Sequence, residues 1–466
     1  MLNENIVGYL RTVGAAYASR HAQPAQLAAL LLIQPAHYPH FRAVLPPPTV
    51  DLSAQIAAVL ALKKTDRFVA FIAALFAYLA GHPPPSQLLA RPALLPREAF
   101  APAYWAWSEL YAKAFALYST PETLYFGPVL RSLASTLLAL ASRADHAVGG
   151  GSQKAMMDAA AKLSRTVGLC AIDRTPAPAD ETRRRDTLWA GNGSFAAYFR
   201  LNNLRLCDTV LSSLDSAFAL NRQFSPSSLH ASGIAYNDGV STIGTDVGEA
   251  SYSRADRVTY RYYLGRLRLS QHRIRLAHGQ LRWAFDNCVV SSRNKRTILI
   301  PLLVSALILG HYPSTPLLRA AGLAPQFEAL LVALRKGNGA ATMQELERWR
   351  EWHRAHGNYS LLRERMMAGC WRNLLRRCLL ITRAATPAPP PAPGAQSPPP
   401  NLSLASILPM VRLAWQDNSL ELDDVECVVV SLIDQGIIKG YVIHKTRRLV
   451  LARGEALGFP PLGSVR

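Results

Sequence analysis

Four basic side chains near the C-terminus are the strongest candidates for chemistry in this sequence. Lys439, Lys445, Arg447 and Arg448 concentrate positive charge on and beside one predicted hairpin, with Tyr441 as the single aromatic ring among them. Ammonium and guanidinium groups bind phosphate oxygens, and phosphate contacts carry no base sequence information. We therefore expect this site to hold RNA or DNA backbone with little sequence preference. The alternative interpretation is an ordinary solvated turn.

Patterns typical of catalysis are missing from the sequence. It has no Gly-x-Ser-x-Gly elbow, no Walker phosphate loop, no dinucleotide fingerprint and no cysteine and histidine at metal spacing. His37, His40 and Asp51 superficially suggest metal ligands, but HYPH offers His-x-x-His on a proline-flanked loop, not the His-x-His of a metalloprotease. We predict a protein that is not an enzyme, with no catalytic residue, no metal site and no cofactor.

The basic hairpin belongs to a unit, roughly 404–453, that the sequence predicts as two helices followed by a two-stranded wing. Apolar residues recur at the spacing of one helical face: Val425, Val428, Val429, Leu432 and Ile433. Gly436 follows as a helix stop, and two β-rich runs, 441–444 and 449–452, are separated by four polar residues. This order predicts a winged helix. Because a unit of this size is marginal alone, we expect it to be docked on what precedes it.

The helix of this unit begins with four acidic residues, Glu421, Asp423, Asp424 and Glu426. Carboxylates suit the positive end of the helix dipole, but they repel phosphates. In a typical helix-turn-helix reader the second helix enters the major groove. We therefore interpret this helix as a poor recognition helix and assign the contact to the wing.

The sequence of the rest of the chain predicts helices. Residues 1–143 are rich in Ala and Leu, and 153–383 are interpreted as stacked helical hairpins in which Gly265, Ala277, Leu281 and Ala284 match one tetratricopeptide-like repeat. NKRTILIPLLVSALILGHYP predicts a helix buried on several sides, with Pro301 in its first turn. The proline-rich stretch 384–400 predicts an extended excursion, before the winged helix of 401–458. The predicted fold is mainly α, a helical-repeat solenoid capped by a C-terminal winged helix.

Several motifs resemble one known family. DDVECVVVSLIDQGIIKGYVIHKTRRLVL, from Asp423, resembles the winged-helix half of a PCI domain. Upstream and in the tail, ADRVTYRYYLGR, NKRTILIPLL, LGHYP, RNLL and FPPLGSV resemble the PCI domain-containing protein 2 family, the PCI subunit of transcription and export complex 2, which is related to signalosome-associated subunit twelve. Weaker similarity in TLWAGNGSFAAYFRLNNLRLC and NIVGYLRTV extends it over nearly the whole chain. The stretches 224–252 and 384–400 depart from the pattern as insertions.

This resemblance implies a non-enzymatic scaffold or adaptor subunit of a nuclear, transcription-coupled mRNA export complex at the nuclear pore, with a further cytoplasmic presence open. It implies two protein partners, a GANP-type PCI scaffold that sets its own winged helix beside this one and a small acidic DSS/Sem protein. The alternative is a protein-only PCI scaffold associated with the COP9 signalosome or a proteasome-lid-like assembly. Co-purification with nucleoporins or with deneddylase subunits separates the two.

The composition indicates a basic protein with reduced cysteines and no membrane-spanning segment. The formal net charge is +20 over 466 residues, and arginine outnumbers lysine 42 to 9. A basic surface attracts polyphosphate, although a GC-rich genome gives the same bias. The charge is uneven, with eleven basic and two acidic residues in 254–296. Six cysteines without a CxxC pair predict free thiols in a nuclear or cytosolic protein. The N-terminus lacks a secretory pattern, and apolar runs of about 13 residues are too short to span a bilayer.

Overall fold

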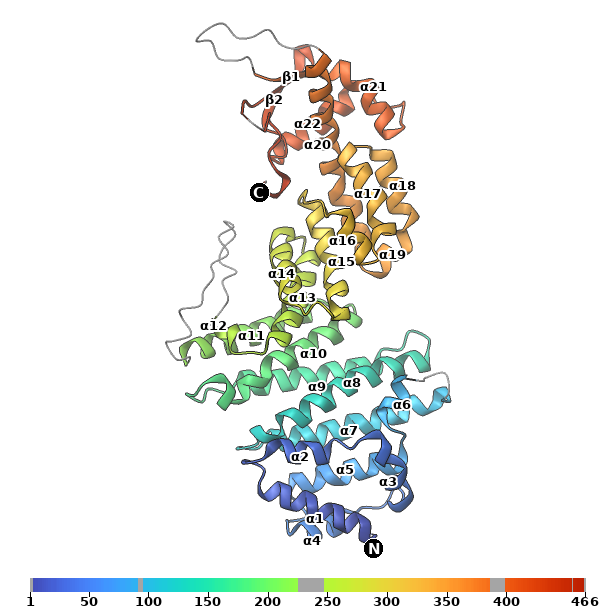
Figure 1. Cartoon of the computed structure of the whole chain (residues 1–466), viewed down its shortest axis with the longest axis vertical. Coiled ribbons are helices and arrows are strands. Elements are labelled where there is room, and N and C mark those ends of the chain that lie inside the picture. Colours follow the sequence, from blue (N-terminus) through green and yellow to red (C-terminus); the bar gives the residue numbers. More distant parts are fainter. Residues whose placement is uncertain (1–2, 91–94, 225–246, 386–398, 455, 465–466) are drawn as a thin grey trace. The chain divides into compact units, whose positions relative to one another are not determined.

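The computed structural model describes residues 3–90, 95–224, 247–385, 399–454 and 456–464 (Figure 1). The chain divides into two compact units, Met1–Tyr263 and Leu264–Arg466, and the division lies inside one helix. The domain boundaries predicted from the sequence stay a prediction. The central parts of the insertions predicted at 224–252 and 384–400 lie outside the described residues.

The first unit is built from helices whose apolar faces pack on successive neighbours. They are α1 (Glu4–Ala18), α2 (Pro24–Leu31), α3 (Tyr38–Val44), α4 (Ser53–Leu60), α5 (Arg67–Gly81), α6 (Pro85–Ala90), α7 (Phe100–Tyr118), α8 (Gly127–Val148), α9 (Lys154–Ala171), α10 (Thr187–Arg200), α11 (Leu206–Gln223), α12 (Val247–Ala250) and the start of α13 (Arg254–Ser270). Helix α7 packs against α5 and α8, and α9 packs against α8 and α10. Tyr104, Trp107 and Tyr111 lie in this core, whereas Trp105 is 49% exposed.

The predicted loop around HYPH is instead helical. His37 ends a 3-10 turn, Pro35–His37, and His40 lies in α3. A proline in the first turn of a helix loses no hydrogen bond, so Pro39, the second residue of α3, does not break the helix. Asp51 accepts a hydrogen bond from the Ser53 backbone N–H just before α4, and it forms an ion pair with Lys64. Among the described residues, no group of three or more His, Cys, Asp or Glu could hold a metal ion.

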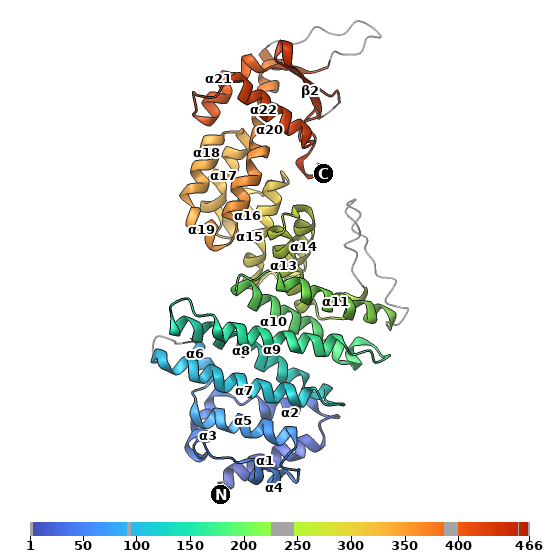
Figure 2. The ribbon, with the colours of Figure 1, turned by 180° about the vertical axis from the view of Figure 1, so that it is seen from behind.

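The second unit begins with helical hairpins, seen from both sides in Figures 1 and 2. They comprise the end of α13, α14 (Ile274–Asn287), α15 (Arg293–Ile308), α16 (Thr315–Ala320), α17 (Ala324–Lys336), α18 (Gly339–Arg348), α19 (Arg350–Ala355) and α20 (Tyr359–Ala385). A Cβ atom on Gly265 would lie 2.5 Å from Leu281, so glycine permits the close approach of α13 and α14 that the repeat pattern predicted.

Helix α15 is buried on several sides, as predicted, with every residue from Ile298 to Leu307 buried. The predicted place of Pro301 is wrong. Ser292 caps the helix by accepting from the Asn294 backbone N–H, so the helix starts earlier and Pro301 lies in its interior. A proline there offers no N–H to the helix ladder. Burial of the whole turn outweighs that loss.

The C-terminal part of the second unit is a winged helix. It consists of β1 (Asn401–Ser403), α21 (Leu404–Trp415), α22 (Leu422–Asp434), β2 (Gly440–Ile443) and β3 (Arg448–Leu451). The strands form an antiparallel sheet in the order β1–β3–β2, so β2 is an edge strand. Glu421 and Asp424 form a capping box at the start of α22. The predicted fold class is confirmed, and strand β1 is an addition that the sequence did not indicate.

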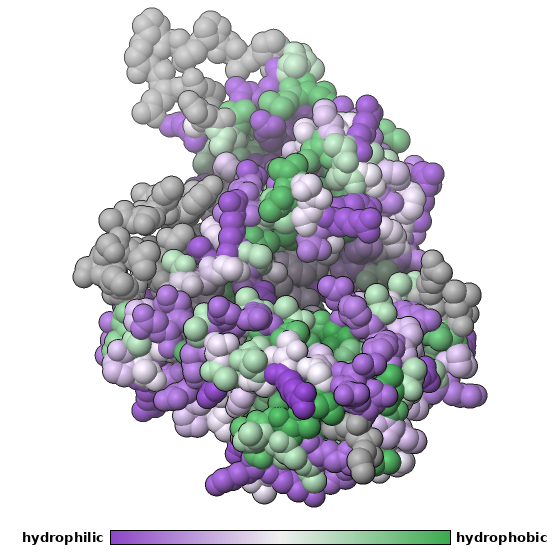
Figure 3. All heavy atoms as spheres, turned by 60° about the horizontal axis from the view of Figure 1, so that its bottom comes forward, coloured by the Kyte–Doolittle hydropathy of each residue, from purple (hydrophilic) through white to green (hydrophobic). Residues whose placement is uncertain are grey.

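Two further features qualify the sequence predictions. All six cysteines are free, and Cys427 alone among them is exposed. One helical run, Leu124–Val148, has the length and hydropathy of a membrane span, a property that core helices of soluble proteins share. About half of its most apolar window, 56%, is buried inside the protein. The face of the molecule drawn in Figure 3 mixes hydrophilic and hydrophobic residues.

Candidate nucleic-acid interface

The structure brings three of the four predicted phosphate-binding residues to one turn of the wing. Lys445 lies in the 3-10 turn His444–Thr446 that follows β2, Arg447 comes next, and Arg448 is the first residue of β3. Lys439 precedes β2 and therefore lies at its opposite end, roughly 13 Å away at ~3.3 Å per residue. The predicted site is thus a basic wing turn of three residues with one separate lysine.

The exposed cations of this turn are Lys445 and Arg448, and Lys439 is also exposed. Arg447 differs, because its guanidinium contacts two carboxylates of α22. Its Nη1 lies 2.7 Å from Asp423 Oδ1 and also contacts Glu426. The hydrogen bond to Glu426 raises the pKa of Arg447, with Asp423 adding to the effect. Only 29% of the Arg447 side chain is exposed.

Glu426 joins two residues of the wing. Its Oε1 lies 2.7 Å from His444 Nδ1 while Oε2 contacts Arg447, and 12% of its side chain is exposed. The hydrogen bond with His444, followed by those from Arg447, lowers the pKa of the Glu426 carboxyl. Sequence reasoning missed this role, since it considered the acidic residues of α22 only for the helix dipole and for their repulsion of phosphate. Their i, i+3 spacing, which puts Asp423 and Glu426 on one helical face, was the available signal.

A shared hydrophobic core holds the winged helix against the preceding helix. Val425, Val429 and Leu432 of α22 belong to the same buried cluster as Leu375 and Leu379 of α20. The C-terminal tail adds polar contacts, because Arg372 of α20 donates hydrogen bonds of 2.8 and 2.6 Å to the carbonyl oxygens of Phe459 and Pro460. The winged helix that includes the wing is therefore docked on α20, as expected from the sequence.

Comparisons with known proteins point to one family. No family model matches the chain. A PCI domain-containing protein of Schizosaccharomyces pombe is 35% identical over 271 residues, which cover 58% of this chain and 53% of that protein. PCI domain-containing protein 2 is 27% identical in Xenopus laevis, over 72% of this chain and 73% of the relative, and 27% identical in Danio rerio, over 76% and 77%. The chain belongs to the PCI domain-containing protein 2 family.

Membership agrees with the helical repeat and the terminal winged helix, and it makes the chain a PCI-family scaffold protein. The match spans about half the length of the S. pombe relative and about three quarters of the two vertebrate ones. Two surfaces of the second unit expose apolar side chains.

The first surface is the free side of the wing sheet. Because β2 is an edge strand, its outer backbone groups can pair with a strand of another chain. Exposed apolar residues lie on β2 and on the neighbouring α22: Tyr441, Ile443 and Val430. Helix α22 packs against β2, so these residues belong to adjacent elements.

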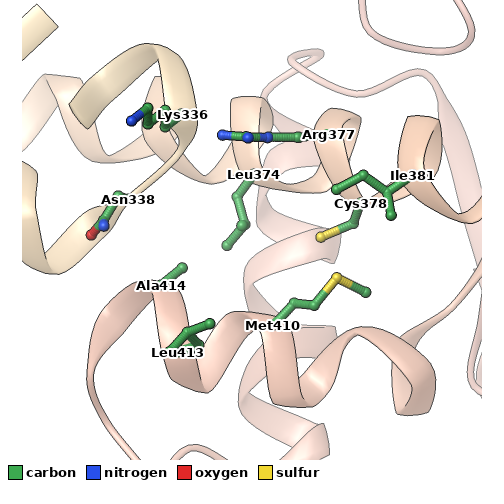
Figure 4. Close-up of a pocket in the computed structure, with 9 residues that line it drawn as sticks. All are labelled: Lys336, Asn338, Leu374, Arg377, Cys378, Ile381, Met410, Leu413 and Ala414. Atoms are coloured by element: carbon green, nitrogen blue, oxygen red, sulfur yellow. The ribbon is translucent and has the colours of Figure 1, made fainter. Parts of the chain in front are cut away.

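The second surface is a groove of about 260 Å³ between α20 and α21 (Figure 4). Its lining is mainly apolar, with a polar rim: Leu374, Cys378, Ile381, Met410, Leu413 and Ala414, then Lys336, Asn338 and Arg377. Figure 4 shows Leu374 and Cys378 facing Met410 across the groove, with Arg377 on the side of α20. Leu413 is 78% exposed. The sequence analysis did not predict this groove.

Proposed function

We propose that this protein is a non-enzymatic adaptor subunit of a nuclear, transcription-coupled mRNA export complex at the nuclear pore, of the transcription and export complex 2 type. It binds nucleic acid through the wing, together with the winged helix of a larger PCI-bearing scaffold. The observation that carries the nucleic-acid part is the exposure of Lys445 and Arg448 on a wing turn whose neighbouring acids are already paired with Arg447.

The wing alone offers few phosphate contacts. Each contact with a single strand contributes a salt-dependent term through the release of counterions, so two or three contacts give weak binding. A second winged helix beside this one extends the basic surface. The edge strand β2, with Tyr441, Ile443 and Val430 exposed nearby, has the strand edge and the apolar side chains that such a partner needs.

The groove suits the second proposed partner, a small acidic protein of the DSS/Sem type. Its apolar lining accepts hydrophobic anchors from an extended peptide, and Lys336 and Arg377 at the rim attract the surrounding carboxylates. Among the described residues, neither cation has an ion-pair partner. Charge complementarity therefore favours an acidic occupant over a basic one.

The nucleic-acid proposal is tested by fluorescence anisotropy with labelled oligo-U and oligo-A across salt concentrations. The double variant K445A/R448A is expected to bind both oligonucleotides more weakly and to flatten the log-log salt slope by roughly 1.4, at ~0.7 per phosphate contact on a single strand. R376A/R383A removes the same charge from exposed positions of α20 and serves as the matched control. Unchanged affinity and slope in a folded K445A/R448A variant would refute the wing as the contact.

The groove is tested separately with a fluorescent acidic DSS/Sem-type peptide. R377E reverses a rim charge and is expected to weaken binding at least tenfold, while R376E reverses the neighbouring exposed charge outside the groove. Equal losses for the two variants would show that only the general basicity of the protein attracts the peptide.

A further inference from the structure

We infer that Arg447 positions the wing and does not itself bind phosphate, because Asp423 and Glu426 of α22 hold its guanidinium in a carboxylate clamp. The inference rests on the proposed nucleic-acid function of the wing and changes the role of one predicted site residue. Lys445 and Arg448, on either side of Arg447 in the chain, remain the phosphate ligands of the turn.

The backbone of Arg447 is held as firmly as its side chain. Its N–H donates to the carbonyl of His444 at 3.1 Å, and its own carbonyl accepts the N–H of Leu404, the first residue of α21, at 2.9 Å. Arg447 adopts φ +52°, the left-handed region, which a residue with a long side chain adopts only where its surroundings fix it. One residue thus joins the wing turn, the start of α21 and the first turns of α22.

The electrostatics of the clamp oppose a phosphate contact at this guanidinium. Two carboxylates already neutralise it, and a phosphate close enough to bind would also meet both of them. Glu426 makes a second wing contact through His444, which faces the same carboxylate from the 3-10 turn. Loss of Glu426 therefore removes one contact from each of two wing residues, Arg447 and His444.

A positioning role for Glu426 and simple charge repulsion predict opposite effects of Glu426→Gln on nucleic-acid binding. If the acidic residues of α22 only repel nucleic acid, then Glu426→Gln removes a negative charge and strengthens binding. If Glu426 positions the wing, the same change loosens the turn that carries Lys445 and Arg448 and weakens binding. Arg447→Asn makes the same test from the other side, since asparagine tolerates the left-handed backbone but is too short for the clamp.

The first measurement is anisotropy of the full chain with labelled oligo-U over a range of salt concentrations. E426Q and R447N are each expected to weaken binding about three- to tenfold with an unchanged salt slope, and the double variant to bind no worse than either single one. R448A, as a phosphate ligand, flattens the slope by ~0.7. Asp434→Asn removes a carboxylate from the last residue of α22 and is the matched control. Tighter binding by E426Q, or a slope change of ~0.7 in R447N, would overturn the inference.

The second measurement is amide hydrogen exchange without nucleic acid. The amides of Leu404 and Arg447 are expected to exchange at least fivefold faster in E426Q and R447N than in the wild type, and at the wild-type rate in D434N. Unchanged exchange in both clamp variants refutes the clamp. Absence of oligonucleotide binding by the wild-type chain together with its scaffold refutes the proposed function instead, and the exchange result still decides whether Arg447 holds the wing.

Discussion

Replacement of Val429 by alanine tests how the winged helix is anchored. Val429 is fully buried on α22, in the cluster that includes Leu375 and Leu379 of α20. The change deletes two methyl groups, each worth about 0.8 kcal/mol of transfer free energy, and leaves a cavity that adds to the cost. We expect a loss of about 2–3 kcal/mol in the free energy of unfolding. Val429→Asp puts a charge in the same place and should cost several kcal/mol.

The same helix supplies the control. Val430 is the next residue and is 49% exposed, so Val430→Ala makes the identical chemical change on the surface and is expected to alter stability by less than about 0.5 kcal/mol. Urea denaturation followed by tryptophan fluorescence measures both, because the stacked rings of Trp371 and Trp415 pack against this cluster. A wild-type midpoint for Val429→Ala, or equal losses for both variants, would refute the described anchoring.

Three further predictions concern other parts of the fold. Phe459→Ala empties a site that is 2% exposed and should cost roughly 3–5 kcal/mol by denaturant titration; stability within 1 kcal/mol of wild type would show that the tail does not anchor the wing. Gly265→Ala drives a Cβ against Leu281 and should lower the melting temperature, whereas Gly168→Ala, on the open side of α9, should not; equal effects would contradict the close packing of α13 and α14. Burial, with a smaller contribution from His356, lowers the pKa of His353 from 6.5 to about 4. The unfolded chain therefore takes up a proton at a higher pH than the folded chain does. The free energy of unfolding is expected to fall by up to about 3 kcal/mol as the pH drops from 6.5 to 4. His353→Leu should remove this part of the pH dependence, and a stability curve still parallel to that of the wild type would refute it.

Local patterns predicted the winged helix because its signals lie close together in the chain. The apolar spacing of α22, the stop at Gly436 and the β-rich runs all fall within about 30 residues, and the strands formed one residue earlier than predicted. Strand β1 was not predicted because a three-residue strand is too short to show an alternating pattern. Its partner β3 also lies far away in the sequence. Pro301 was misplaced because the helix starts at the Ser292 cap, before the buried apolar run that holds the proline.

The candidate site was predictable only in part for a similar reason. Clustering of Lys445, Arg447 and Arg448 is visible in the sequence, but the contact of Arg447 with Glu426 depends on how the wing folds back on α22. The groove is assembled from α20, α21, the last residue of α17 and the N-cap of α18, so no local window contains it. Both the Arg447–Glu426 contact and the groove depend on packing between segments that are far apart in the chain, which a single sequence does not display.

The composition of the native complex tests the central proposal most directly. Endogenously tagged protein is purified at low salt, and its stoichiometric partners are identified by mass spectrometry. An mRNA export adaptor of this family is expected to bring down a larger PCI-bearing scaffold, a small acidic protein and nucleoporins. Recovery of deneddylase subunits of the signalosome, without an export scaffold, would contradict the proposed function and support a protein-only scaffold instead.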